Sequence, residues 1–307
     1  MVRGTRLMSA APSTPTPARA VSRGVRRITL DAAGVPLSAL LSEPEGTAPR
    51  ATVVALHGGG MSAGYFDGQA HPEQSLLALG ASLGYLVLAL DRPGYGSSAA
   101  RLPEGQTLGE QSAAVRAALA DFTSRYTTGA GTLLLAHSFG GKLALSIAAD
   151  PDTPDLLGLD ISGLGHRYAV DLAEASGAAS RRRFHWGPLS LYPPDTFRAS
   201  AGVVAPMPRQ EAGELAQWPR LFTELAPRVR IPVRLTFAEH EAWWRHGEQD
   251  LADLTARLTA APRVVVDRQP AAGHNISLGW AARSYHLRTL AFLEDCIPDR
   301  TRATAHS

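Results

Sequence analysis

The chain of 307 residues has a single cysteine, Cys296, and almost no excess charge of either sign. One cysteine excludes an internal disulfide, and without a CxxC pair or a cysteine cluster we predict no metal site of that kind. The formal net charge of +2 does not favour nucleic acid or an acidic membrane surface as a main partner. The longest apolar runs, such as residues 84–90, have the length of a strand, so no membrane span is expected.

The N-terminal region lacks the uninterrupted apolar stretch of about 7–15 residues that a secretory signal needs, because prolines interrupt it. We therefore interpret residues 1–24 as a disordered leader and residues 298–307 as a loose polar tail. Hydrophobic residues make up 45% and charged residues 19% of the chain, as in an ordinary globular domain. Nothing calls for an oxidising compartment, so we predict a cytoplasmic protein.

Short β-rich runs alternate with Ala- and Leu-rich helical stretches along most of the chain. This alternation predicts a mostly parallel sheet with helices on both of its faces. The predicted strands are 26–30 and 36–41, which form a hairpin, followed by 52–56, 85–90, 132–135, 156–161, 232–237 and 263–266. The predicted helices are 74–83, 109–126, 142–149 and 281–296.

The alternation stops between residues 163 and 228, a stretch rich in arginine, proline and aromatic residues. It is too long for a plain loop, so we predict an inserted lid of short helices between core segments 25–162 and 229–297. Its apolar side chains either line a pocket or pack the lid on the core: Tyr168, Phe184, Trp186, Tyr192, Phe197, Met207 and Trp218. Arginines 181–183 either bind a carboxylate or phosphate or form a solvated helix face.

The turn Ala136-His137-Ser138-Phe139-Gly140 lies between an apolar strand and an Ala/Leu-rich helix. A nucleophile turn between strand and helix is so tight that the positions two before and two after the serine must be small. Ala136 and Gly140 meet that demand, and Ser138 would then stand above the sheet at a helix N-terminus. The alternative is an ordinary serine N-cap.

Four features in this order resemble the α/β-hydrolase superfamily over residues 26–296. They are the His57–Gly60 loop, the Asp91–Gly96 loop, the Ser138 turn, and the Gly273-His274 pair. The resemblance implies an α/β-hydrolase fold with a mostly parallel eight-stranded sheet and a helical lid. It implies Ser138 as nucleophile and His274 as general base.

The resemblance also implies an oxyanion hole made of two backbone N–H groups. One would come from Phe139, and the other from Gly59 or Gly60. The carboxylate that orients His274 is expected between the serine and the histidine in the sequence. Glu241 is the first candidate for it, because it follows a strand at the family's usual position.

Glu239 and Asp160 are the alternatives for this acid. As residues that contact the substrate we name His57, Tyr65, His137, Trp186 and Trp243, and Trp244 is a further candidate for the pocket wall.

The predicted activity is hydrolysis of a carboxylic ester or thioester of a small molecule through an acyl-enzyme, with no cofactor and no metal. A serine in the turn argues against haloalkane dehalogenases and epoxide hydrolases, whose relatives use aspartate there. Two alternatives stay open. One is an acyltransferase or acyl-eliminating lyase with the same triad, and the other is a non-catalytic receptor for a small molecule.

Overall fold

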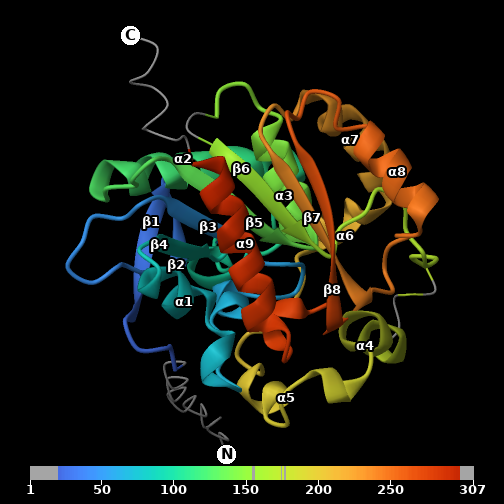
Figure 1. Ribbon diagram of the computed structural model, residues 1–307, viewed down its shortest axis with the longest axis horizontal. Coiled ribbons are helices and arrows are strands. Elements are labelled where there is room, and N and C mark those ends of the chain that lie inside the picture. Colours follow the sequence, from blue (N-terminus) through green and yellow to red (C-terminus); the bar gives the residue numbers. More distant parts are fainter. Residues whose placement is uncertain (1–19, 154–155, 174, 176–177, 298–307) are drawn as a thin grey trace, which may run out of the picture.

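The computed structural model describes residues 20–153, 156–173, 175 and 178–297 (Figure 1). The expected leader, up to residue 19, and the expected tail 298–307 lie outside the described residues. An eight-stranded sheet has the order β1-β2-β4-β3-β5-β6-β7-β8. β2 is antiparallel to both of its neighbours, and all pairs from β4 to β8 are parallel.

The strands are β1 Val25–Ala32, β2 Val35–Ser42, β3 Thr52–Leu56, β4 Leu86–Leu90, β5 Thr132–His137, β6 Leu156–Ser162, β7 Val233–His240 and β8 Val264–Gly273. The helices are α1 Leu76–Ser82, α2 Leu108–Arg125, α3 Phe139–Ala148, α4 Ala178–Trp186, α5 Thr196–Ala199, α6 Arg209–Gly213, α7 Trp218–Leu225, α8 Glu248–Ala256 and α9 Ala282–Cys296.

Helices cover both faces of the sheet, and each face has its own hydrophobic core. α1 and α9 pack on one face, and Figure 1 shows α9 lying across the strands on the near side. α2, α3, α7 and α8 pack on the other face. β3 and β4 are buried along their whole length, because a central parallel strand is covered on both sides.

The predicted fold class and the predicted strands are confirmed, with boundaries shifted by a few residues. β8 is longer than the prediction of 263–266, because its second half continues along β7 past a register shift near Ala238. α8 was not predicted. Of its two leucines, Leu254 is buried in the core of this face and Leu251 packs partly buried against it.

Between β6 and β7 the described residues form short helices and 3-10 turns, α4 to α7 among them. This segment, residues 163–228, is called the 163–228 segment below. It lies at the carboxyl end of the parallel strands, where ligands bind in open α/β sheets.

Candidate active site

Ser138 lies in the sharp turn between β5 and α3, with a backbone φ of 52° and ψ of −117°. A positive φ is strained for a residue other than glycine and often marks a functional site. Small neighbours allow the turn. A Cβ atom on Gly140 would lie 2.2 Å from the carbonyl oxygen of Leu56. Ala136 is buried between β3 and β6.

Ser138, His274 and Glu241 form a chain of hydrogen bonds, although they are far apart in the sequence. His274 Nδ1 lies 2.8 Å from Glu241 Oε2, and His274 Nε2 lies 3.2 Å from Ser138 Oγ. Because a carboxylate only accepts, the neutral ring carries its proton on Nδ1, and Nε2 accepts from the serine hydroxyl. The side chains of His274 and Glu241 are buried.

The carboxylate of Glu241 is itself held in place, since its Oε1 accepts a hydrogen bond of 2.9 Å from the backbone N–H of Trp243. The first alternative, Glu239, is exposed and accepts from the backbone N–H of Ala271 at 2.7 Å. Glu241, and not Glu239, is therefore the glutamate that contacts His274.

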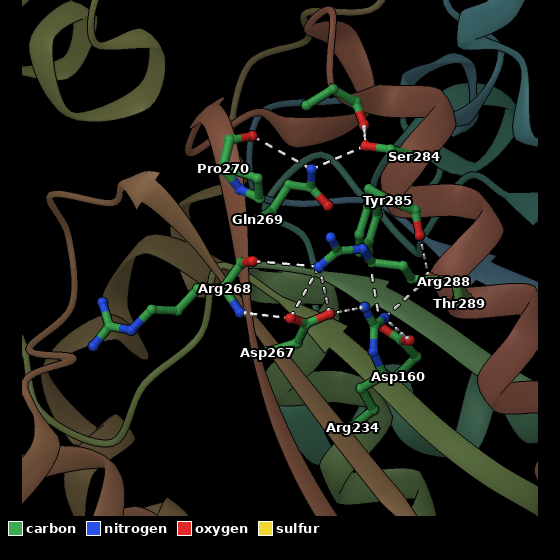
Figure 2. Close-up of polar contacts among 11 residues, drawn as sticks. Asp160, Arg234, Asp267, Arg268, Gln269, Pro270, Ser284, Tyr285, Arg288 and Thr289 are labelled. Carbon is green, nitrogen blue, oxygen red and sulfur yellow. Dashed lines mark hydrogen bonds and ion pairs between the residues drawn. The ribbon is translucent and has the colours of Figure 1, made fainter.

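Asp160, the second alternative, belongs to a different cluster (Figure 2). Its buried carboxylate pairs with Arg234, which also pairs with Asp267, and Arg288 contacts Asp267 from α9. Figure 2 shows this network between β6, β7, β8 and α9. Asp160 is thus engaged in ion pairing within the core, and the structure does not bring it to His274.

Gly59 and Gly60, the two glycines predicted for the oxyanion hole, lie side by side in the loop after β3 but have different contacts. The N–H of Gly60 donates to the Tyr95 hydroxyl at 3.0 Å, and its carbonyl accepts from Ala205 at 2.9 Å. Gly59 lines the same cavity as Ser138 and Phe139. As the first residue of α3, Phe139 has an N–H without a partner inside the helix. Of the two glycines, Gly59 therefore lies beside Phe139 in the cavity wall, while the N–H of Gly60 is bonded to Tyr95.

Arg92, which sequence reasoning missed, holds this loop from behind. Its guanidinium is completely buried and donates to the carbonyl oxygens of His57 and Gly58. It also donates to Gln111 and makes two bonds of 2.8 and 2.9 Å to Glu211 on α6. All five donors of the guanidinium are thereby used. One residue ties the oxyanion loop to α2 and to the 163–228 segment.

A cavity of about 470 Å³ lies over Ser138. The 163–228 segment contributes mainly apolar side chains to its wall, among them Tyr168, Leu172, Met207 and Leu215. His185 and the two tryptophans Trp243 and Trp244 also line it. The prediction for Trp243 thus agrees with its position in the wall. His185 was not predicted, because no sequence pattern around it distinguishes it from the other histidines.

The other four predicted substrate contacts do not line this cavity, and each has a packing or hydrogen-bonding role instead. The buried ring of His57 bonds the Gly58 carbonyl and accepts from Arg92 N–H. Burial, reinforced by the charge of Arg92, holds the pKa of His57 well below its usual range. The ring therefore stays neutral and shapes the loop.

Tyr65 and His137 are stacked, with ring centroids 4.7 Å apart, and His137 packs against His274. Burial and the neighbouring imidazoles keep the pKa of His137 well below its usual range. Trp186 packs on Tyr192 and Phe197 rather than over Ser138. His137 thus contacts His274 and is itself covered by Tyr65, whereas Trp186 packs within the 163–228 segment.

Lys142 was also missed, and it is the only lysine of the chain, whose other 29 basic residues are arginines. Its side chain lies in the cavity wall, buried, and its Nζ donates to the Tyr168 hydroxyl at 2.8 Å. Burial lowers the pKa of Lys142 to about 7, against the opposite effect of Glu211 and Glu214. Its uniqueness in the sequence was the signal that could have revealed it.

Among the described residues, no group of three His, Cys, Asp or Glu side chains is arranged to hold a metal ion. Within the same ranges, none of the helices combines the length and apolarity needed to cross a bilayer.

Residues 53–286 match the sequence profile of the alpha/beta hydrolase family. No curated protein shows a significant match to the chain. Solved structures do match. A thermostable carboxyl esterase from Bacillus coagulans, crystallised with glycerol, has a TM-score of 0.67 at 17% identity, covering 90% of this chain and all of the other.

A carboxylesterase from Bacillus subtilis has a TM-score of 0.61 at 18% identity, over 88% of this chain and 91% of its own. A thioesterase domain from the curacin biosynthetic pathway has a TM-score of 0.55 at 19% identity, over 86% and 99%. At such low identity these three structures are similar to this chain in fold, and fold alone does not determine a substrate.

Proposed function

The chain belongs to the alpha/beta hydrolase family, and from this membership we propose that it is a serine hydrolase acting on a carboxylic ester or thioester of a small molecule. The observation that carries the proposal is the hydrogen-bond chain from Glu241 through His274 to Ser138, with distances of 2.8 and 3.2 Å. Esterases and a thioesterase among the structures of similar fold add support.

In the proposed reaction, Ser138 Oγ attacks the carbonyl carbon while His274 Nε2 takes the hydroxyl proton. Glu241 keeps the Nδ1 proton in place and stabilises the imidazolium. The N–H groups of Phe139 and Gly59 bind the negative oxygen of the tetrahedral intermediate. His274 then gives the proton to the leaving alcohol or thiol, and an acyl-enzyme remains. Water, activated by the same imidazole, releases the acid.

We also propose that the 163–228 segment acts as a lid. It supplies much of the apolar wall over Ser138, and such a wall excludes bulk water from the reacting groups. Glu211 and Ala205, both in this segment, contact Arg92 and the oxyanion loop. The proposed lid is therefore bonded directly to the loop after β3 and to the arginine that holds this loop.

A fluorophosphonate probe tests the proposal, because it phosphonylates an activated serine. We expect wild type to be labelled at Ser138, and Ser138→Ala to remain unlabelled while folding normally. An unlabelled wild type would exclude a serine hydrolase. A panel of short esters, long esters and acyl thioesters, each with and without an alcohol acceptor, then separates hydrolysis from acyl transfer.

A further inference from the structure

Lys142 faces the same cavity as the proposed nucleophile. It is the fourth residue of α3, and Ser138 is the residue directly before the first turn of this helix. Both line the cavity, and Lys142 is the only Lys, Arg, Asp or Glu among its described lining residues. In a chain that otherwise uses arginine for every basic residue, the single lysine is placed beside the reacting serine.

The ammonium of Lys142 has few partners. The Tyr168 hydroxyl is the one hydrogen-bond acceptor that the described residues offer to it, and no described carboxylate lies within 4.0 Å of Nζ. Four aromatic rings surround it at 5.2–5.7 Å from their centroids, those of Phe139, Tyr168, Trp218 and Trp244. An ammonium has three N–H donors, so it can bind further acceptors.

The two acids whose charges act on Lys142, Glu211 and Glu214, form hydrogen bonds with other groups. Glu211 makes two bonds to Arg92 and accepts from the Tyr95 hydroxyl. Glu214 accepts from the backbone N–H of Leu108. A buried cation without a bonded counter-ion is costly, and the aromatic rings supply attraction but no acceptor. An anion entering through the cavity would supply that acceptor.

We propose that Lys142 binds a carboxylate of the substrate, so that the enzyme acts on esters or thioesters that carry a carboxylate a short chain from the scissile carbonyl. The inference rests on the proposed hydrolase function. Ser138 and Lys142 line one cavity and are separated by only three residues at the start of α3, so a ligand that meets both needs only a short spacer. The Tyr168 hydroxyl already donates to the Leu215 carbonyl, so Lys142 is the donor left for the ligand, and a carboxylate needs fewer donors than a phosphate.

The carboxylate can lie on the acyl side or on the alcohol side, and matched substrates distinguish the two. For the acyl side the pair is monoethyl glutarate and the ethyl ester of glutaramic acid, which replaces the carboxylate by a carboxamide of the same shape. For the alcohol side the pair is carboxymethyl butyrate and carbamoylmethyl butyrate. We expect wild type to prefer the carboxylate in one pair, by roughly tenfold or more in kcat/KM.

Lys142→Met keeps the length of the side chain and removes the charge. We expect it to lower the carboxylate-to-carboxamide ratio of kcat/KM by roughly tenfold or more. Arg220→Met is the matched control. It also removes a cation, but one that is 65% exposed and paired with Glu224, so its ratio should equal that of wild type. Equal ratios in wild type and Lys142→Met would overturn the inference.

Binding can be measured without turnover. Because the chain has one lysine, Ser138→Ala protein made with ¹³C-lysine gives one Cε signal in an NMR spectrum. We expect monoethyl glutarate or carboxymethyl butyrate to shift this signal and to raise the pKa that it reports, whereas the carboxamides should not. This arm keeps Lys142 intact, so it decides the question even where Lys142→Met fails to fold.

The two proposals fail in different ways. A wild type that is unlabelled by fluorophosphonate overturns the hydrolase function, while the NMR arm still tests carboxylate binding. A wild type that is labelled and hydrolyses both members of each pair equally, with an unmoved Cε signal, keeps the hydrolase function and overturns the role of Lys142.

Discussion

Replacing Glu211 by glutamine should destabilise the protein far more than the same change in an exposed ion pair. The side chains of Arg92 and Glu211 are both 0% exposed, and they share two hydrogen bonds. In Glu211→Gln the amide nitrogen would face donors of Arg92, so a buried guanidinium would lose its counter-ion and one acceptor. Removing one partner of a buried pair costs about 3–5 kcal/mol.

For a chain of this size, 3–5 kcal/mol corresponds to a fall in Tm of roughly 5–8 °C. Glu224→Gln is the matched control, because Glu224 is 53% exposed in its pair with Arg220. An exposed pair contributes about 0–1 kcal/mol, which corresponds to a fall of about 2 °C at most. Differential scanning calorimetry of wild type and the two variants measures these shifts.

The same change should slow catalysis below the melting range. Arg92 fixes the carbonyls of His57 and Gly58, and Glu211 also accepts from Tyr95, which binds Gly60 N–H. A looser oxyanion loop should lower kcat by roughly tenfold or more with a smaller change in KM. The reasoning is refuted if Glu211→Gln melts within about 2 °C of Glu224→Gln.

Other substitutions separate roles that the structure distinguishes. Glu241→Gln should lower kcat by roughly a thousandfold or more, and Glu239→Gln by less than about threefold, as esterase assays can measure. Asp160→Asn should lower Tm by several degrees because it removes the buried carboxylate of the two that pair with Arg234 and leaves only the partly exposed Asp267, yet Ser138 should still react with fluorophosphonate. The pKa of Lys142 is lowered from 10.5 to about 7 by burial, so between these values the unfolded chain binds more protons than the folded one. The free energy of unfolding of wild type minus that of Lys142→Met should therefore rise from pH 7 to pH 9, and a constant difference in denaturant titrations would contradict this. The titratable groups around Lys142 are the same in both proteins: Glu211, Glu214, Arg92, Tyr168 and His185.

The sequence was sufficient for what depends on local patterns. Alternating strands and helices predicted the sheet, and the small residues around Ser138 predicted its tight turn. His274 was found by its place after the last strand. The acid was narrowed to three carboxylates by the order of serine, acid and histidine in the family and by the strands that relatives use for the acid. The hydrogen bond between the Glu241 carboxylate and the His274 ring is seen only in the three-dimensional structure.

What the sequence did not predict depends on contacts between distant residues. Arg92 and Glu211 are 119 positions apart, and no local sequence pattern around either residue predicts that the two form a buried ion pair. The choice between Gly59 and Gly60 depended on the hydroxyl of Tyr95, which binds the N–H of Gly60. His57 was predicted to contact the substrate, whereas its ring hydrogen-bonds the Gly58 carbonyl and the backbone N–H of Arg92.

The contrast between Arg92 and Lys142 explains why one basic residue near the site is a lysine. Arginine stays charged and presents five donors, and at position 92 the fold supplies an acceptor for each of them. At position 142 the described residues supply one hydroxyl and aromatic rings. An arginine there would be a permanent cation with unpaired donors. Lysine needs fewer acceptors and can lose its proton when the cavity is empty, since burial brings its pKa to about 7. A basic residue whose counter-ion arrives with the substrate is therefore better served by lysine than by arginine.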